Sequence, residues 1–176
     1  MRIVLAARAF VTLAIGVYIT FNQSHSAEAG LIALGLFGVG YAVANAASSF
    51  FFAKRLTAIE TVPMTVIALL IGVFAFLVSA NSSVTHKASL TALVTAWGLV
   101  SAAFELYLAR RQGFKTQLGR DTLLSAILNF MLAILFLTVP LKSVELVGFF
   151  GAYLVLSGVH VGISAATPKA KPKSRG

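Results

Sequence analysis

Six long apolar segments, separated by short polar ones, account for most of the chain. Each is close to the about 20 residues that a helix needs to cross a hydrocarbon layer about 30 Å thick. The segments are continuously apolar, whereas the strands of a membrane β-barrel alternate apolar and polar residues. The pattern therefore predicts an all-α, polytopic membrane protein with six transmembrane helices, at roughly Ile3–Phe21, Gly30–Ala53, Thr61–Ala80, Leu90–Ala109, Thr122–Pro140 and Val144–Ala166.

The polar connections between these segments restrict how the helices can be joined. They cover Asn22–Ala29, Lys54–Glu60, Asn81–Ser89, Arg110–Asp121 and Leu141–Ser143. All are too short to contain a soluble domain, so consecutive helices are expected to run in opposite directions. We therefore expect one transmembrane domain, residues 1–167, built from three helical hairpins over approximately residues 3–53, 61–109 and 122–166.

Small residues recur at similar points of the three hairpins, which suggests an internal repeat. The first helices carry Gly16, Gly72 and Ala133 at corresponding points, and the second helices carry small or polar residues at 38 and 45, 96 and 103, and 151 and 158. Helices in lipid associate by close packing at Gly, Ala and Ser, because burying apolar surface gains them little there. These positions therefore predict helix contacts. The glycines of residues 30–40 lack the strand and acidic residue of a nucleotide-binding motif.

Composition excludes most other classes of protein. Of the 176 residues, 59% are hydrophobic, 11% are charged and none is cysteine, and the mean hydropathy is +0.92. A soluble domain has about 25% charged residues, a disordered chain is polar, and a disulfide-rich scaffold needs cysteine.

The net charge of +9 indicates the topology of the chain in the membrane, because the basic residues are distributed unevenly between the predicted connections. Lys and Arg favour the cytoplasmic side of a membrane, and only Lys87 and Lys142 fall in connections on the opposite side. We therefore expect both termini in the cytoplasm, and the first segment retained rather than cleaved as a signal peptide. The basic residues on the expected cytoplasmic side are Arg2, Arg8, Lys54, Arg55, Arg110, Arg111, Lys115, Arg120, Lys169, Lys171, Lys173 and Arg175.

The last nine residues, 168–176, are expected to form a mobile basic cytoplasmic tail, because they contain no apolar residue larger than alanine. Their cations, at Lys169, Lys171, Lys173 and Arg175, suit contact with anionic lipid headgroups. A nucleic-acid partner is not expected, since basic residues are not interleaved with aromatic ones on a folded surface. The expected partners are the lipid bilayer and either a larger membrane protein complex or further copies of the chain.

The chain resembles the HdeD-like acid-resistance membrane proteins. The resemblance covers most of residues 7–166 and is clearest in the last hairpin, in Ala133-Ile-Leu-Phe-Leu-Thr-Val-Pro140 and in Gly151-Ala-Tyr-Leu-Val-Leu-Ser-Gly158. It implies a bacterial inner-membrane protein with six spans in three hairpins and an association with acid stress. A proline at the outward end of each first helix is typical of the family, but this chain has only Pro140.

Four polar residues inside the predicted spans are candidates for a functional site, because polar groups are costly there and often functional. They are Asn45, Glu105, Asn129 and His160, and counting along the helices places all four in the cytoplasmic half of the membrane. One hypothesis is that Glu105 and His160 face each other in a proton-sensitive pair that the two asparagines support. The alternative is that Glu105 reaches to the cytoplasmic surface while His160 makes a single interhelical hydrogen bond.

Other residues are expected to have structural roles. Pro63 suits the first turn of the third helix, where its missing N–H has no cost, and Trp97 is expected to be buried. Asp121 suits the N-terminus of the fifth helix. No spacing of nucleophile and base, paired carboxylates or metal ligands is present, so we expect neither an enzyme nor a cofactor or metal.

The sequence therefore favours a non-enzymatic membrane protein of the acid-resistance type, with a proton-sensitive cluster in the membrane. Two alternatives remain open. One is an accessory or assembly subunit that packs against a larger membrane complex, which the short loops favour. The other is a small transporter or channel, which the repeats favour and the few polar residues in the outer half disfavour.

Overall fold

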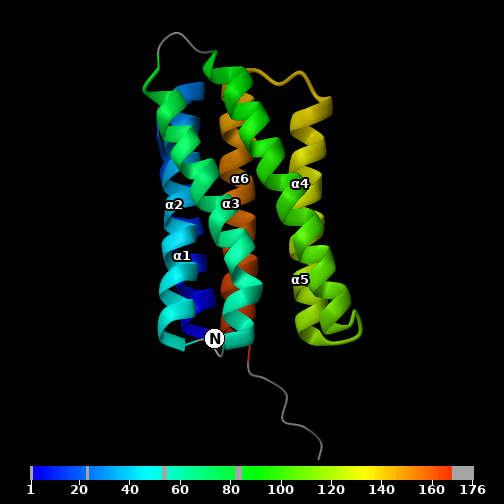
Figure 1. The fold of residues 1–176 in the computed structure, drawn as a ribbon. Helices are drawn as coiled ribbons and strands as arrows, with labels where there is room; N and C mark the ends of the chain where they lie inside the picture. Colours follow the sequence, from blue (N-terminus) through cyan, green and yellow to red (C-terminus); the bar gives the residue numbers. More distant parts are fainter. Residues whose placement is uncertain (1, 23, 53–54, 82–84, 168–176) are drawn as a thin grey trace, which may run out of the picture.

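Six helices make up the chain in the computed structural model, which describes residues 2–22, 24–52, 55–81 and 85–167. The prediction of an all-α fold is confirmed for this part of the chain (Figure 1). The tail cations Lys169, Lys171, Lys173 and Arg175 lie outside the described residues. The helices are α1 (Arg2–Phe21), α2 (Ala27–Phe52), α3 (Arg55–Ser79), α4 (His86–Gln112), α5 (Gln117–Thr138) and α6 (Ser143–Ala166).

Five of these helices, α2 to α6, are long and apolar enough to cross a membrane. The apolar part of α1, Leu5–Phe21, is shorter. The structure is thus compatible with a multi-pass membrane protein, and the sixth span stays a prediction.

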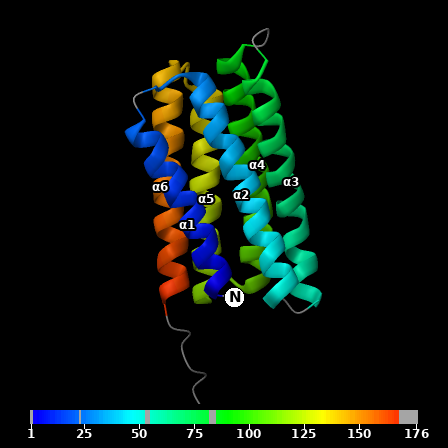
Figure 2. The ribbon, with the colours of Figure 1, turned by 90° about the vertical axis from the view of Figure 1, so that its left-hand side faces the viewer.

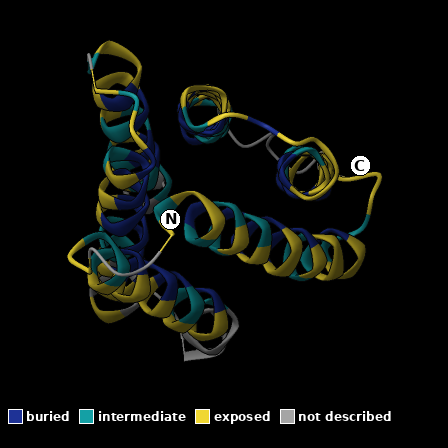
Figure 3. Cartoon of the chain, turned by 90° about the horizontal axis from the view of Figure 1, so that it is seen from above, coloured by how far each residue is buried: buried dark blue, intermediate teal, exposed yellow. Residues whose placement is uncertain are grey.

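The helices stand side by side and alternate in direction (Figures 1 and 2). The end of α2, the start of α3 and the α4–α5 connection lie at the end of the bundle that carries the start of α1 and the end of α6. We call this the terminal end. Seen along the bundle, exposed residues face outward and buried ones face the neighbouring helices (Figure 3).

Several helices extend further than the apolar pattern indicated, since α3, α4 and α5 begin at residues 55, 86 and 117 rather than at 61, 90 and 122. The connection expected at Lys54–Glu60 is wrong, because α3 already begins at Arg55. The charged residues Arg55 and Glu60 end the apolar run but not the helix, since a helix can continue beyond the apolar layer. Pro63 consequently lies inside α3 rather than in its first turn, and the missing N–H leaves one helical carbonyl without its usual donor.

The closest helix pairs are α1 with α6, α2 with α3, and α4 with α5. The two members of each pair come from different predicted hairpins. The α2–α3 and α4–α5 pairs join consecutive hairpins, and the α1–α6 pair brings together the first and the last helix. The fold is therefore held by contacts between the predicted hairpins as much as within them.

Small residues lie at the centre of all three close pairs. A Cβ added at Gly38 would lie 2.5 Å from the Ala68 carbonyl oxygen and 2.8 Å from Gly72 Cα. In the same way, a Cβ on Gly98 of α4 would lie 2.9 Å from Ala133 Cβ of α5. On α1, a Cβ on Gly16 would lie 2.9 Å from the backbone nitrogen of Val155. Such distances are too short for real Cβ contacts, so the absence of a side chain lets these helices approach.

An aromatic cluster fills the middle of the bundle. Phe37 and Tyr41 of α2 contact Trp97 of α4 edge-on, with ring centroids 5.1 Å and 5.3 Å away. Phe150 of α6 completes the cluster at 6.4 Å from Phe37. Trp97 is only 2% exposed, so the prediction of its burial is confirmed.

Gly38→Ala and Gly148→Ala form a matched pair of variants that tests the close contact of α2 with α3. Both changes raise helix propensity equally, but only Gly38 has neighbours in the way, since nothing lies within 4 Å of a Cβ on Gly148. We expect Gly38→Ala to be less stable than Gly148→Ala by about 1–3 kcal/mol, the usual cost of overpacking. Unfolding of the two purified variants in the same detergent measures the difference, and equal stabilities would contradict the packing argument.

Candidate functional site

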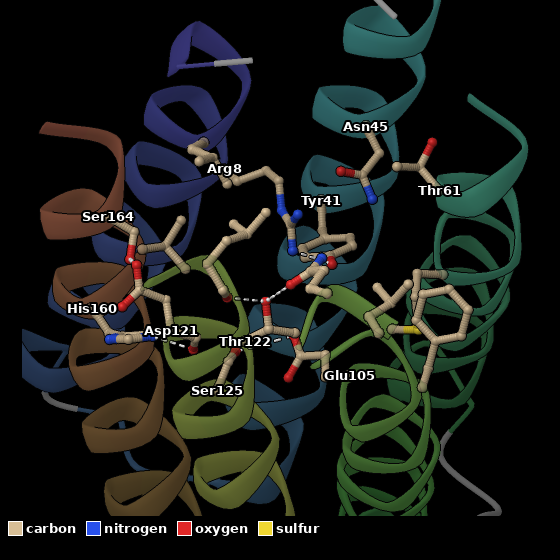
Figure 4. Close-up of a pocket in the computed structure, with 17 residues that line it drawn as sticks. Arg8, Tyr41, Asn45, Thr61, Glu105, Asp121, Thr122, Ser125, His160 and Ser164 are labelled. Carbon is tan, nitrogen blue, oxygen red and sulfur yellow. Dashed lines mark hydrogen bonds between the residues drawn. The ribbon is translucent and has the colours of Figure 1, made fainter. Parts of the chain in front are cut away.

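A cavity of about 200 Å³ lies near the terminal end of the bundle, and polar groups from all six helices line it (Figure 4). Its walls include apolar side chains, among them Leu5, Met64 and Phe104. Its polar lining consists of Arg8 on α1, Tyr41 and Asn45 on α2, Thr61 on α3, Glu105 and Gln112 on α4, Asp121, Thr122 and Ser125 on α5, and His160 and Ser164 on α6.

Glu105 is bound by two side chains of the neighbouring helix α5. The Ser125 hydroxyl donates to Oε1 of Glu105 at 3.0 Å, and the Asn129 amide donates to Oε2 at 2.8 Å. Asn129 is buried, whereas Ser125 lines the cavity together with Glu105. The two carboxylate oxygens therefore have different surroundings, one beside the cavity and one facing the packed interior.

Behind Asn129, a line of hydrogen bonds continues into the aromatic cluster. Trp97 Nε1 donates to the Tyr153 hydroxyl at 3.2 Å, and Tyr153 donates to Asn129 Oδ1 at 2.6 Å. With the bond from Asn129 to Glu105, these contacts join α4, α5 and α6. We call Trp97, Tyr153, Asn129, Glu105 and Ser125 the carboxylate network.

Arg8 carries a positive charge into the same cavity from α1. Its guanidinium donates a hydrogen bond to the Tyr41 hydroxyl and lies 4.3 Å from the centre of the Tyr41 ring. Asn45, one turn further along α2, interacts with Tyr41 through its side chain. A cation over an aromatic face is stabilised by the quadrupole of the ring, more strongly where water is excluded. Tyr41 thereby anchors Arg8 inside the bundle.

His160, on α6, lines the same cavity and bonds to α5. Its Nε2 lies 2.9 Å from the backbone carbonyl oxygen of Asp121, which makes this nitrogen the donor, since a carbonyl only accepts. Ser164, one turn along α6, donates to Oδ2 of Asp121 at 3.2 Å. The two bonds tie the end of α6 to the beginning of α5.

The structure brings all four predicted intramembrane residues into this region. Glu105 and Asn129 bond directly, and Asn45, Glu105 and His160 line one cavity. Among the described hydrogen bonds, none joins Glu105 to His160. Instead His160 makes one interhelical bond, as the alternative interpretation expected for it. Whether Glu105 and His160 respond to protons together stays a prediction.

Sequence reasoning missed several residues of the site. Arg8 was interpreted as a topology signal, although it lies within an apolar run, several residues from the predicted beginning of the span. Asp121 was expected only to stabilise the N-terminus of a helix, but α5 begins earlier, at Gln117. Asp121 therefore lies inside α5, where it contacts α6. Ser125 and Tyr153 gave no signal, because Ser and Tyr are common in membrane helices.

The chemistry available here is proton exchange and the binding of small polar groups. Glu105, Asp121 and His160 can gain or lose a proton, and Arg8 supplies a fixed positive charge. Within the described residues, no three His, Cys, Asp or Glu side chains are grouped so that they could hold a metal ion.

Asn129→Ala tests whether the carboxylate network stabilises the bundle. The change removes the donor to Glu105 Oε2 and the acceptor for Tyr153. Leaving buried polar groups unsatisfied costs about 1–3 kcal/mol, so we expect a loss of stability of that size. Asn22→Ala is the control, since the Asn22 side chain makes only exposed hydrogen bonds, at the end of α1 and in the α1–α2 connection. Equal thermal stability of the two variants in detergent would contradict a supporting role for the network.

Comparisons of this chain with family models, with curated proteins and with solved structures found no match. The resemblance to the HdeD-like proteins therefore rests on sequence features alone, clearest in residues 133–140 and 151–158.

Proposed function

We propose that this chain is a non-enzymatic integral membrane protein that responds to cytoplasmic pH through the cavity at its terminal end. The observation that carries the proposal is the grouping of Arg8, Glu105, Asp121 and His160 around one cavity of about 200 Å³. These four side chains come from α1, α4, α5 and α6. Elsewhere the described core is almost entirely apolar.

Charges in this position link proton uptake to helix packing. The charge of the Glu105 carboxylate attracts the Arg8 guanidinium across the cavity. When Glu105 takes up a proton, this attraction is lost and the lining becomes more positive. Coulomb energies are several-fold larger in a protein interior than in water, so this change alters the forces that hold α1 and α4 around the cavity.

The proposed membrane topology has six spans, with both termini in the cytoplasm. The full length of α1 supports the sixth span, because its 20 residues extend about 30 Å, the thickness of the hydrocarbon layer. The basic residues Arg110, Arg111, Lys115 and Arg120 belong to the α4–α5 connection and its flanks, at the same end as the termini. Their charge favours the cytoplasm for that end.

The proposed setting is acid stress in the inner membrane of a bacterium. The resemblance to HdeD-like proteins supports this setting through the last hairpin, especially residues 133–140 and 151–158. A cavity near the end proposed to face the cytoplasm suits a protein that responds to acidification of the cell interior. The lipid bilayer is the first partner, and the tail cations are proposed to contact its anionic headgroups.

The topology is testable with introduced cysteines, because the chain has none of its own. Lys115→Cys lies in the α4–α5 connection and Ser24→Cys in the α1–α2 connection, and both positions are exposed. We expect a membrane-impermeant maleimide added to intact cells to label Ser24→Cys alone. After the membrane is opened, it should label both. Labelling of Lys115→Cys in intact cells would contradict cytoplasmic termini.

The pH response is testable in cells that depend on this protein for survival in acid. Glu105→Gln keeps the shape of the cavity side chain but fixes it in one protonation state, so it can no longer follow a change of pH. We therefore expect survival through a shift to low pH and back to fall to that of cells without the protein. Glu28→Gln, an exposed acid at the start of α2, should survive like the unaltered chain. Equal survival of both variants, at equal amounts in the membrane, would contradict the proposed function.

A second candidate function is that of an accessory subunit in a larger membrane complex. A groove of about 640 Å³ on the outside of α4 favours it, and small side chains line that groove. Ala88, Ala92 and Ala96 recur there at every fourth position and are exposed, a spacing that lets a further helix approach closely in lipid. Purification in mild detergent separates the candidates: a partner retained by the unaltered chain and lost in Ala92→Phe would favour the accessory function.

A transporter is the remaining alternative, because the cavity is polar and lies within the bundle. Reconstitution into proteoliposomes tests it directly. Flux of protons or solutes that disappears in Glu105→Gln and persists in Glu28→Gln would favour transport over a packing response.

A further inference from the structure

We propose that Glu105 binds its proton on Oε1, beside Ser125, and that the remaining carboxylate network transmits this event to Trp97. The inference rests on the proposed function, since it identifies the proton site within the same cavity. It follows from the directions of the hydrogen bonds. These directions are determined by groups of the network that can only donate or can only accept.

The orientation of the Asn129 amide is determined by a backbone group. Its Nδ2 lies 3.1 Å from the carbonyl oxygen of Ser125, and a carbonyl oxygen can only accept. The NH2 group of Asn129 must therefore face Ser125 and Glu105, and Oδ1 must face Tyr153. A rotated amide would place two acceptors against each other at that distance.

The other bonds of the network then have one direction each. Oδ1 of Asn129 only accepts, so the Tyr153 hydroxyl at 2.6 Å must donate to it. Trp97 Nε1 can only donate, and it does so to the Tyr153 oxygen. Every bond from Trp97 to Glu105 thus points toward the carboxylate. Chains of hydrogen bonds with one direction polarise each other, so the charge on Glu105 acts on Trp97 through two residues.

The same logic distinguishes the two oxygens of Glu105. Oε2 accepts from the Asn129 NH2 group, which cannot accept in return, so a proton on Oε2 would face a donor. Oε1 accepts from Ser125, whose hydroxyl can rotate and accept instead. On protonation, an O–H bond forms at Oε1, the carboxylate becomes neutral, and the Ser125 bond reverses. The proton comes from the cavity side, because Ser125 and Glu105 both line the cavity and Asn129 does not.

Other ionisable groups face this carboxyl group from the surrounding helices. They are Arg8 on α1, Tyr41 on α2, Asp121 on α5, and His160 and Tyr153 on α6. The residues of α3 that line the cavity, Thr61 and Met64, carry no charge. A change of charge on His160 or Asp121 therefore changes the electric field at Glu105. Only protonation of Glu105 itself, however, reverses the hydrogen bond with Ser125.

Trp97 makes the proposal measurable, since it is the only tryptophan of the chain. We would titrate the full-length protein in lipid nanodiscs and record two signals, Trp97 fluorescence and the infrared carbonyl stretch of a protonated carboxyl group. In the unaltered protein, acidification should change the fluorescence in one step and produce the infrared band over the same pH range. A fluorescence step without such a band would contradict the proposal.

Glu105→Gln mimics the protonated state, because its amide oxygen can accept from Asn129 while its NH2 group donates to Ser125. We expect its fluorescence to equal the low-pH value of the unaltered protein at every pH, and the band of Glu105 to be absent. Tyr153→Phe cuts the network between Trp97 and Asn129. It should keep the band but lose more than half of the fluorescence step, whereas the control Tyr107→Phe, at an exposed tyrosine of α4, should keep both.

Ser125→Ala tests which oxygen holds the proton. Without Ser125 the new O–H group loses its acceptor, so the infrared band should move to higher frequency. Ser164→Ala removes a hydroxyl that bonds Asp121 instead, and it should leave the band in place. An unmoved band in Ser125→Ala would place the proton on Oε2 and overturn the assignment. A full fluorescence step in Tyr153→Phe, or one that persists in Glu105→Gln, would overturn the coupling to Trp97.

These outcomes are separable from those of the proposed function. If the spectra behave as described while Glu105→Gln cells survive acid normally, the proton site stands and the proposed function is wrong. If survival depends on Glu105 but the spectra do not, the proposed function stands and this inference is wrong. Circular dichroism of every variant confirms that its helices have formed before either result is used.

Discussion

Close approach of helix backbones at small residues is the contact on which the rest of this structure depends. In a bilayer the lipid is as apolar as the helix surface, so burying leucine or phenylalanine does little to bring two helices together. Gly38 on Gly72, Gly98 on Ala133, and Gly16 on Val155 supply the close packing instead. Each contact joins a helix of one predicted hairpin to a helix of another, which links the three hairpins into one bundle.

That packing also determines where the polar side chains meet. With the three close pairs formed, Arg8, Tyr41, Glu105, Asp121 and His160 all line one cavity at the terminal end. A charged group inside an apolar bundle is tolerated only when other groups satisfy it. The structure satisfies the Glu105 carboxylate with Ser125 and Asn129, and it holds Arg8 against Tyr41. The free-energy cost of burying Glu105 and Arg8 is thus offset by bonding partners that the packing of the helices brings into contact with them.

Most of the secondary structure was predictable from the sequence, because a run of about 20 apolar residues has few alternatives to a helix in a bilayer. The predicted end of the connection before α3 was wrong for a physical reason. Charge at Arg55 and Glu60 ends the apolar layer, whereas a helix ends only where its backbone bonds do, and α3 continues through Pro63. The polar residues of the site were predictable where they were rare, as with Glu105 and His160. Common residues such as Ser125 and Tyr153 were not.

The sequence by itself determined the six helices, their alternating direction and the four conspicuous polar positions, because hydropathy and connection length act locally along the chain. Only the tertiary structure decided that α1 pairs with α6, that Glu105 bonds to Asn129 rather than to His160, and that Trp97 is linked to the carboxylate. Those outcomes depend on which helix faces meet and at what height. Many apolar helix faces are nearly equivalent in sequence. A few glycines determine which faces pack together, because they allow short distances between neighbouring helices that exist only in the packed bundle.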